Sequence, residues 1–137
     1  MSTLEIAKKI RVFLVDDEPG ACSLMRFILE AESDMEASGS RTKVAGLLDA
    51  LAQHPTDVLL IDLTLRGEDA IEAIRDVKRA RPEIRIVVLS GCMDPKVLGR
   101  AREAGAALCV AKSFEIDATL QAIRNATFSQ PTPDLTG

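Results

Sequence analysis

Short apolar runs alternate strictly with helical patterns along this chain, and this alternation constrains the fold more than any other feature of the sequence. The runs are mostly rich in valine, isoleucine and leucine and are bounded by charged or turn-forming residues, which is typical of strands buried on both faces of a parallel sheet. The predicted strands comprise residues 10–15, 58–61, 84–89 and 106–110. Residues 35–38 are a weaker fifth candidate, and their low β-propensity predicts an edge strand.

Apolar residues recur at three- and four-residue spacing in each gap between predicted strands and after the last one. Pro19 is suited to the first turn of the first helix, and Thr42 is a candidate N-cap of the second. Asp94 and Pro95 begin the fourth helix, which Gly105 ends. Strict alternation with short connections predicts a doubly wound α/β sandwich with right-handed crossovers.

The length of 137 residues and the hydrophobic content of 47% indicate one globular domain with a core of its own. We expect the domain to span residues 9–126 and residues 127–137, which include two prolines, to form a linker or flexible tail. No apolar run approaches the roughly 18 residues of a membrane-spanning helix. Three cysteines without a CxxC pair predict reduced thiols and a cytoplasmic location.

A net charge of −4 gives the chain no general basic field for DNA. Only 3% of the residues are aromatic, which argues against a stacking surface for single-stranded nucleic acid.

Acidic and other polar residues follow four of the predicted strands at the edge where ligands bind in such sheets. Asp16 and Asp17 follow the first strand and Asp62 follows residues 58–61, while Ser90 and Lys112 lie at the ends of the next two strands. Each residue alone has an ordinary explanation as a turn or helix-capping residue. Together they bring at least three carboxylates into one cleft, where each close pair repels by roughly 1–4 kcal/mol.

A hard divalent cation would offset this repulsion, and carboxylate oxygens suit Mg²⁺. No histidine or cysteine is predicted to lie beside these carboxylates. The single histidine, His54, lies in a predicted surface loop at the far end of the sheet. Zinc is therefore disfavoured.

The set Asp16-Asp17, Asp62, Ser90 and Lys112 resembles the signature of the receiver domain of two-component response regulators. The amino-acid sequences of residues 10–17 and 87–90 are especially similar to those of receivers of LuxR/NarL-type transcription factors. This resemblance implies a flavodoxin-like five-stranded parallel sheet of order 2-1-3-4-5 with five helices.

The resemblance also implies a role for each acidic residue. Asp62 would be the nucleophile that accepts a phosphoryl group from a histidine kinase or a phosphotransfer protein. Asp17 and Asp62 would bind Mg²⁺ directly, Asp16 largely through water, and the backbone carbonyl of Thr64 would complete the protein ligands. The chain would act as a phosphoacceptor rather than an enzyme.

Two further roles follow from the resemblance. Lys112 would neutralise phosphoryl oxygens, and Ser90 would move to hydrogen-bond the phosphoryl group and so report its presence. A second copy of the chain is a further candidate partner.

The sequence departs from the family pattern at three places. Arg66, which is followed by Gly67, occupies the position four residues after the phosphoacceptor where many receivers have a proline. Ser113 replaces a proline that often follows the lysine. Cys109 occupies the position of an aromatic residue that commonly switches rotamer on activation.

Two other classes of protein share part of this pattern. A haloacid-dehalogenase-like phosphatase also uses an aspartate and Mg²⁺ but needs a second aspartate two residues later, where this chain has Thr64. A flavodoxin cradles a phosphate in its first loop, which the acidic residues 16–18 would repel.

Within the receiver class, two outputs stay open. The chain is either the regulatory half of a LuxR/NarL-type transcriptional regulator or a stand-alone receiver that acts by protein contact. In the first case DNA is reached only through a domain that this chain does not contain.

Overall fold

A computed structural model describes residues 8–63, 69–91, 94–112 and 116–128 of the chain. Within these residues, five parallel strands form one sheet in the order β2-β1-β3-β4-β5. The strands are β1 (Ile10–Val15), β2 (Met35–Arg41), β3 (Val58–Asp62), β4 (Arg85–Ser90) and β5 (Leu108–Ala111). The predicted α/β fold and strand order are therefore confirmed.

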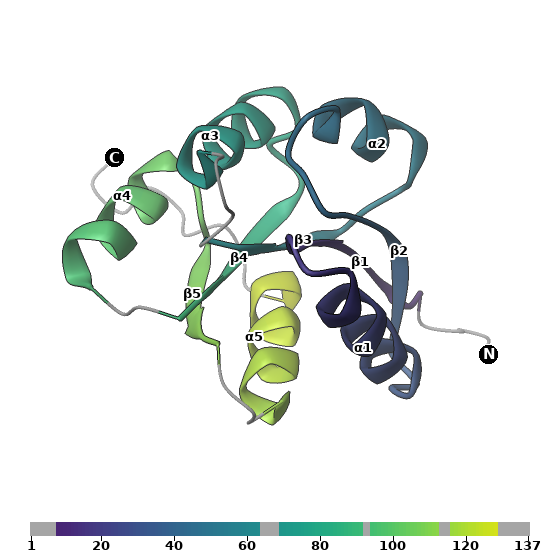
Figure 1. The fold of residues 1–137 in the computed structure, drawn as a ribbon. Helices are drawn as coiled ribbons and strands as arrows, with labels where there is room; N and C mark the ends of the chain where they lie inside the picture. The colour runs from purple at the N-terminus through teal and green to yellow at the C-terminus, as the bar shows by residue number, and fades with distance from the viewer. Residues whose placement is uncertain (1–7, 64–68, 92–93, 113–115, 129–137) are drawn as a thin grey trace.

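Five helices cover the two faces of the sheet, α1 and α5 on one face and the other three on the opposite face (Figure 1). The helices are α1 (Pro19–Glu30), α2 (Leu47–Gln53), α3 (Ala70–Ala80), α4 (Pro95–Ala104) and α5 (Ile116–Phe128). Alternate residues of each central strand enter the two cores. Phe13 packs under the three-helix layer and Leu14 under the α1–α5 layer. Burial on both faces explains why β1, β3 and β4 read as continuous apolar runs.

The edge strand β2 is longer than the predicted residues 35–38, because it continues to Arg41 beside β1. Its register shifts opposite Val12 and Phe13, and Gly39 lies where the Phe13 ring passes. A Cβ atom at residue 39 would approach Phe13 Cε2 to 2.8 Å, a separation that side chains do not tolerate. Glycine thus lets a stretch of low β-propensity pair over the ring.

Thr42 is not the N-cap of the second helix, and this prediction was wrong. Gly46 occupies the N-cap position with a φ of 77°, and α2 begins only at Leu47. The left-handed conformation at Gly46 breaks the helical pattern that the apolar spacing suggested from residue 44. The preceding turn is held by the Arg41 guanidinium, whose Nη2 donates to the Ala45 carbonyl at 2.7 Å.

Other boundaries also differ by one or two residues from the predicted ones: β3 ends at Asp62 rather than at residue 61, and β4 spans Arg85–Ser90 rather than residues 84–89. Strand β5 begins at Leu108 rather than Ala106, because the Ala106 N–H donates to the Ala101 carbonyl at 3.0 Å and continues the turn that ends α4 at Gly105. Helix α5 runs to Phe128 and so includes Thr127 and Phe128, which were predicted to lie in the tail.

At the sheet edge opposite the acidic residues, Arg11 and Asp57 join the starts of β1 and β3. The Asp57 carboxylate accepts from the Arg11 backbone N–H at 2.9 Å, from Nε at 3.0 Å and from Nη2 at 3.0 Å. The hydrogen bond from the Arg11 side chain, the largest effect, lowers the pKa of Asp57 below its usual value of 3.8. This carboxylate therefore stabilises the fold above that value, and the contribution is lost as the pH falls through the depressed pKa.

Replacing Asp57 with asparagine is expected to lower the free energy of unfolding by about 1 kcal/mol at about pH 7, because the pair is partly exposed and screened. The difference should shrink as the pH is lowered through the depressed pKa of Asp57, where the wild-type carboxyl group becomes protonated in the folded protein. Urea denaturation of both proteins over a series of decreasing pH values measures this. A difference that stays constant over the series would show that charge is not the cause.

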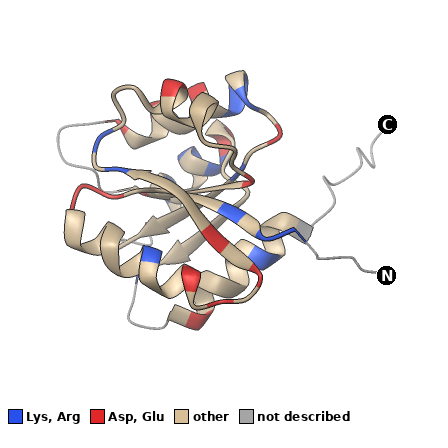
Figure 2. Ribbon diagram, turned by 90° about the vertical axis from the view of Figure 1, so that its right-hand side faces the viewer, with Lys and Arg blue, Asp and Glu red and all other residues tan. Residues whose placement is uncertain are grey.

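Acidic and basic residues are interspersed over both helical layers in the view of Figure 2. Among the described residues, no helix has the length and apolar character required to cross a membrane.

Candidate functional site

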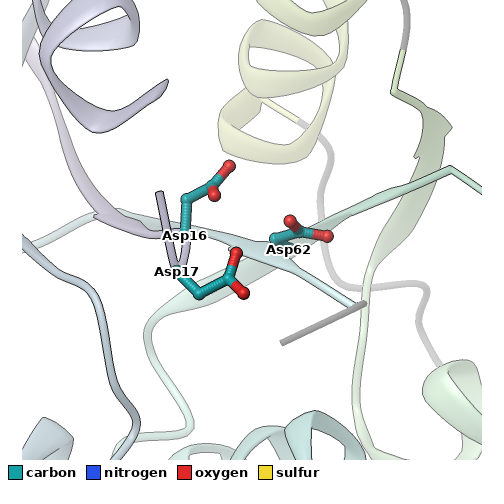
Figure 3. A group of neighbouring side chains, drawn as sticks. All are labelled: Asp16, Asp17 and Asp62. Carbon is teal, nitrogen blue, oxygen red and sulfur yellow. The ribbon is translucent and has the colours of Figure 1, made fainter. Parts of the chain in front are cut away.

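Three carboxylates meet at the carboxyl edge of the sheet, as the sequence predicts. Asp16 and Asp17 directly follow β1, and Asp62 is the last residue of β3. These strands are neighbours, so their ends bring the three side chains together (Figure 3). One oxygen from each carboxylate lies within 4.8 Å of the others. Asp62 is 2% exposed and Asp16 8% exposed, so two of the three charges lie largely out of solvent.

Lys112 supplies the positive charge of this cluster. Its ammonium donates to Asp16 Oδ2 at 2.9 Å and to Asp62 Oδ2 at 2.8 Å. Burial lowers the pKa of Lys112, but hydrogen bonds and Coulombic attraction from Asp62 and Asp16 outweigh burial and raise the pKa above its usual value. Lys112 therefore stays charged. Its positive charge compensates the negative charge of the buried Asp62 carboxylate, to which it is hydrogen-bonded.

Backbone hydrogen bonds at the edge of the sheet fix the position of Lys112. Lys112 follows β5, and its backbone N–H donates to the Ser90 carbonyl at the end of β4, at 2.8 Å. Leu63, which follows the phosphoacceptor candidate Asp62, donates its N–H to the Leu89 carbonyl at 2.8 Å. These two hydrogen bonds join the end of β3 to that of β4 and the end of β4 to that of β5. They hold Asp62 and Lys112 on either side of Ser90.

Ser90 ends β4 and is 1% exposed. Because β4 lies between β3 and β5, the residue stands at the same edge as Asp62 and Lys112. The predicted strand-end position of Ser90 is therefore correct, while its role as a switch stays a prediction.

The turn after β1 is held by contacts that sequence reasoning missed. Asp16 Oδ1 accepts the Glu18 N–H at 3.0 Å, and the Asp16 N–H donates to the Arg41 carbonyl at 3.2 Å. The buried Cys22 thiol donates to the Asp16 carbonyl at 3.5 Å and lies 3.9 Å from the Arg41 carbonyl. Burial, and then the charge of Asp16, raise the pKa of this thiol. Cys22 is therefore a neutral thiol that helps to hold the turn after β1 in place.

Several predicted residues lie outside the described part of the chain: Thr64, Arg66, Gly67 and Ser113. Cys109 is described. It is half-buried in β5 and packs against the core on the α2–α3–α4 face.

The donor set fits a hard divalent cation. Asp16, Asp17 and Asp62 offer oxygen ligands only, and the described cluster contains neither histidine nor cysteine. Three carboxylates against one ammonium leave an excess of negative charge that a cation would offset. His54 is exposed beyond α2, near the ring of Phe13, with 6.0 Å between the ring centroids, and takes no part in this cluster.

The sequence matches the family model of the response regulator receiver domain over residues 12–124. The chain therefore belongs to the receiver domain family of two-component response regulators. The transcriptional regulatory protein LiaR of Bacillus subtilis is 30% identical over 122 residues, which cover 89% of this chain and 58% of that relative. The chain spans about half the length of the transcriptional regulators of LuxR/NarL type that it matches.

Solved structures give the same result for the fold. A LuxR-family two-component response regulator from Aurantimonas sp. SI85-9A1 aligns with a TM-score of 0.79 and 26% identity, over 85% of this chain and 84% of that chain. The receiver domain of the putative response regulator NarL from Mycobacterium tuberculosis aligns with a TM-score of 0.82 and 22% identity, over 90% of this chain and 99% of that chain.

Proposed function

We propose that this chain is a phosphoacceptor receiver that takes a phosphoryl group on Asp62 from a histidine kinase or phosphotransfer protein. The observation that carries the proposal is the setting of Asp62. Its carboxylate is 2% exposed, bonded to Lys112 at 2.8 Å and close to the carboxylates of Asp16 and Asp17. Family membership supports the same assignment.

The chemistry needs positioning and charge neutralisation above all. An oxygen of Asp62 forms the new bond to phosphorus, while the bond from phosphorus to the donor's leaving group breaks and the leaving group keeps the electron pair. Lys112 is held where it can pair with phosphoryl oxygens as a point charge. Ser90, at the adjacent strand end, supplies a hydroxyl that can donate to the same group.

The metal assigned to the acidic cluster is Mg²⁺, with Asp17 and Asp62 as direct ligands, Asp16 acting largely through water, and the carbonyl of Thr64 as a further proposed ligand. Bound Mg²⁺ supplies positive charge that offsets the carboxylates and the incoming phosphoryl oxygens. The chain's own contribution is to hold Asp16 by the Glu18 N–H and the Cys22 thiol, and to keep Asp62 shielded from water.

We further propose that the chain is the regulatory half of a LuxR/NarL-type transcriptional regulator in the cytoplasm, with a receiver unit that begins near residue 9 and a linker that follows the end of α5. The support is the match to about half of several transcriptional regulators. Contact with DNA would then be made by a separate domain. A stand-alone receiver is the second candidate, since the match covers 90% of the sporulation initiation phosphotransferase F of Bacillus subtilis, at 25% identity. The length of the encoding reading frame distinguishes the two.

Acetyl phosphate, a small phosphodonor, tests the function without knowledge of the kinase. In the presence of Mg²⁺, the intact mass of the protein should rise by one phosphoryl group, and excess chelator should prevent the rise. An unchanged mass at saturating donor and Mg²⁺ would contradict the proposal. Continuous turnover of free phosphomonoesters would instead favour a Mg²⁺-dependent phosphatase.

Cys109 leads to a prediction about how the signal leaves the site. Because no large ring occupies this position of β5, phosphorylation should alter the Ser90 end of β4 without a rotamer change of an aromatic side chain. Hydrogen exchange with and without a beryllofluoride mimic should therefore change by more than about twofold in residues 90–97 and by little in residues 108–110. Large changes centred on Cys109, with residues 90–97 unaltered, would contradict this account.

A further inference from the structure

Two groups of ion pairs join α5 to the segments that flank α1, its neighbour on one face of the sheet (Figure 1). At the carboxyl edge of the sheet, Lys112, which precedes α5, donates to Asp16, which precedes α1, at 2.9 Å. At the opposite edge, Arg124 of α5 binds Glu32 and Asp34, which lie between α1 and β2. The layer formed by α1 and α5 is thus held by ion pairs at both ends.

The second group, here called the Arg124 cluster, comprises Arg124, Glu32 and Asp34. Arg124 Nε donates to Asp34 Oδ2 at 2.8 Å, and Nη2 donates to Asp34 Oδ1 at 2.9 Å and to Glu32 Oε1 at 2.7 Å. Two parallel hydrogen bonds to one carboxylate fix the guanidinium group in direction as well as in position. The hydrogen bond from Arg124, the largest effect, lowers the pKa of Asp34 below its usual value of 3.8, so this carboxyl group is ionised at neutral pH.

Packing along α5 differs between its two halves. Ile116, in the first turn, is only partly buried and borders a cavity of about 500 Å³ between α1 and α5. Ile123 and Ala126, farther along the helix, are 0% and 3% exposed in the core under the α1–α5 layer. A segment beside a void has fewer packing contacts to lose when it moves. The first turn of α5 is therefore less firmly held than the half that carries Arg124.

The proposed phosphoryl transfer acts on only one of the two groups of ion pairs. A phosphoryl group on Asp62 brings new oxygens beside the Lys112 ammonium, and these compete with Asp16 for its N–H donors. Three residues separate Lys112 from the start of α5, so a change of its partner acts on the first turn of the helix. The Arg124 cluster lies at the other edge of the sheet, where the Asp34 carbonyl accepts the N–H of the first residue of β1.

We propose that Arg124 is a fixed pivot for α5, so that phosphorylation displaces the first turn of the helix while its C-terminal half stays in place. The proposal rests on the proposed function, because the phosphoryl group is what draws Lys112 away from Asp16. The direction in which the chain leaves α5 then does not change. The signal reaches a partner through the surface near the start of α5 and not through the linker that follows the helix.

Two isoleucines in the same helix report on its two halves. The methyl resonances of Ile116 and Ile123 in NMR spectra respond to rearrangement of their surroundings, and the Ser90 amide reports on occupancy of the phosphoacceptor site. When beryllofluoride and Mg²⁺ are added to the wild-type protein, we expect the Ser90 amide and the Ile116 methyl resonance to shift. The Ile123 methyl resonance should stay within its line width.

Arg124→Gln removes the charge and the paired hydrogen bonds of the pivot. The melting temperature should fall by about 4 °C, and the protein should remain folded because Ile123 and Ala126 still pack in the core. Beryllofluoride should now shift the Ile123 methyl resonance by an amount comparable with that of Ile116. Arg124→Lys keeps the charge and one hydrogen bond, and its Ile123 response should lie between those of the wild-type protein and Arg124→Gln.

Arg75→Gln is the matched control. Arg75 donates to Glu72 at 2.7 Å on α3, which covers the other face of the sheet (Figure 1). This variant also loses one arginine and one ion pair, and it should respond to beryllofluoride as the wild-type protein does. Phosphoryl uptake from acetyl phosphate should be the same in the wild-type protein, Arg124→Gln and Arg75→Gln.

An Ile123 shift in the wild-type protein as large as that in Arg124→Gln would overturn the pivot, because α5 would then move as one body. Equal Ile123 responses of Arg124→Gln and Arg75→Gln would overturn it as well. In both cases a shifted Ser90 amide would leave the proposed function intact. Absence of a shift at Ser90 in every one of these proteins would contradict the proposed function and the pivot together.

Discussion

Replacing Asp62 with asparagine is expected to abolish phosphoryl uptake from acetyl phosphate while the protein remains folded. The amide has no negatively charged oxygen to attack phosphorus, yet its carbonyl can still accept the Lys112 hydrogen bond that the carboxylate receives at 2.8 Å. Labelling should fall from one phosphoryl group per chain to none, as measured by intact mass. The melting temperature should change little, because one of three adjacent negative charges is removed together with part of an ion pair.

Asp57→Asn is the matched control for this experiment. Asp57 precedes the same strand that Asp62 ends, so both substitutions remove one negative charge at opposite ends of β3. Asp57→Asn should lose some stability and keep full labelling. Equal labelling of Asp62→Asn and the wild-type protein would refute Asp62 as the acceptor.

Asp17→Ala should slow labelling by more than about 100-fold without weakening the fold. Loss of even an outer partner of a metal ligand lowers metal affinity by about 10- to 100-fold, and Asp17 is proposed as a direct ligand. The fold gains because the remaining Asp16 and Asp62 share the Lys112 ammonium between them with less repulsion. The melting temperature should therefore hold or rise by a few degrees, on the order of 1 kcal/mol of stabilisation.

The neighbouring Glu18 provides the control, because its exposed carboxylate lies outside the three-aspartate cluster. Glu18→Ala should label at close to the wild-type rate, and Mg²⁺ titration of both variants should show weakened binding only for Asp17→Ala. Full labelling of Asp17→Ala, or labelling in excess chelator, would refute the role of the metal.

The convergence of Asp16, Asp62 and Lys112 could be predicted because parallel strands end at one edge of a sheet. The order of the apolar runs determines which strand precedes each of these residues. The prediction that a residue lies at a strand end holds even when the predicted strand boundary is wrong by one or two residues. Strand β5 shows this, since its start was misplaced by two residues while Lys112 still followed its end.

The contacts around Asp16 could not be predicted in the same way. Two of them involve the Arg41 carbonyl, which reaches Asp16 and Cys22 because β2 extends past Gly39 and shifts its register against β1. The low β-propensity of this stretch predicted a shorter strand. The apolar spacing predicted a helix that begins at Thr42, because the sequence pattern does not reveal the left-handed conformation of Gly46. Cys22 therefore read as an ordinary reduced thiol, although its position under the acidic turn gives it a structural role.

Locating the phosphoryl group on the labelled protein tests the central claim most directly. Borohydride reduces an aspartyl phosphate to homoserine, so tandem mass spectrometry of the trapped and digested protein identifies the modified residue. After labelling with acetyl phosphate and Mg²⁺, we expect homoserine at residue 62 and unmodified aspartate at residues 16 and 17. Homoserine at either of those two residues, or at an acidic residue elsewhere with Asp62 intact, would contradict the account.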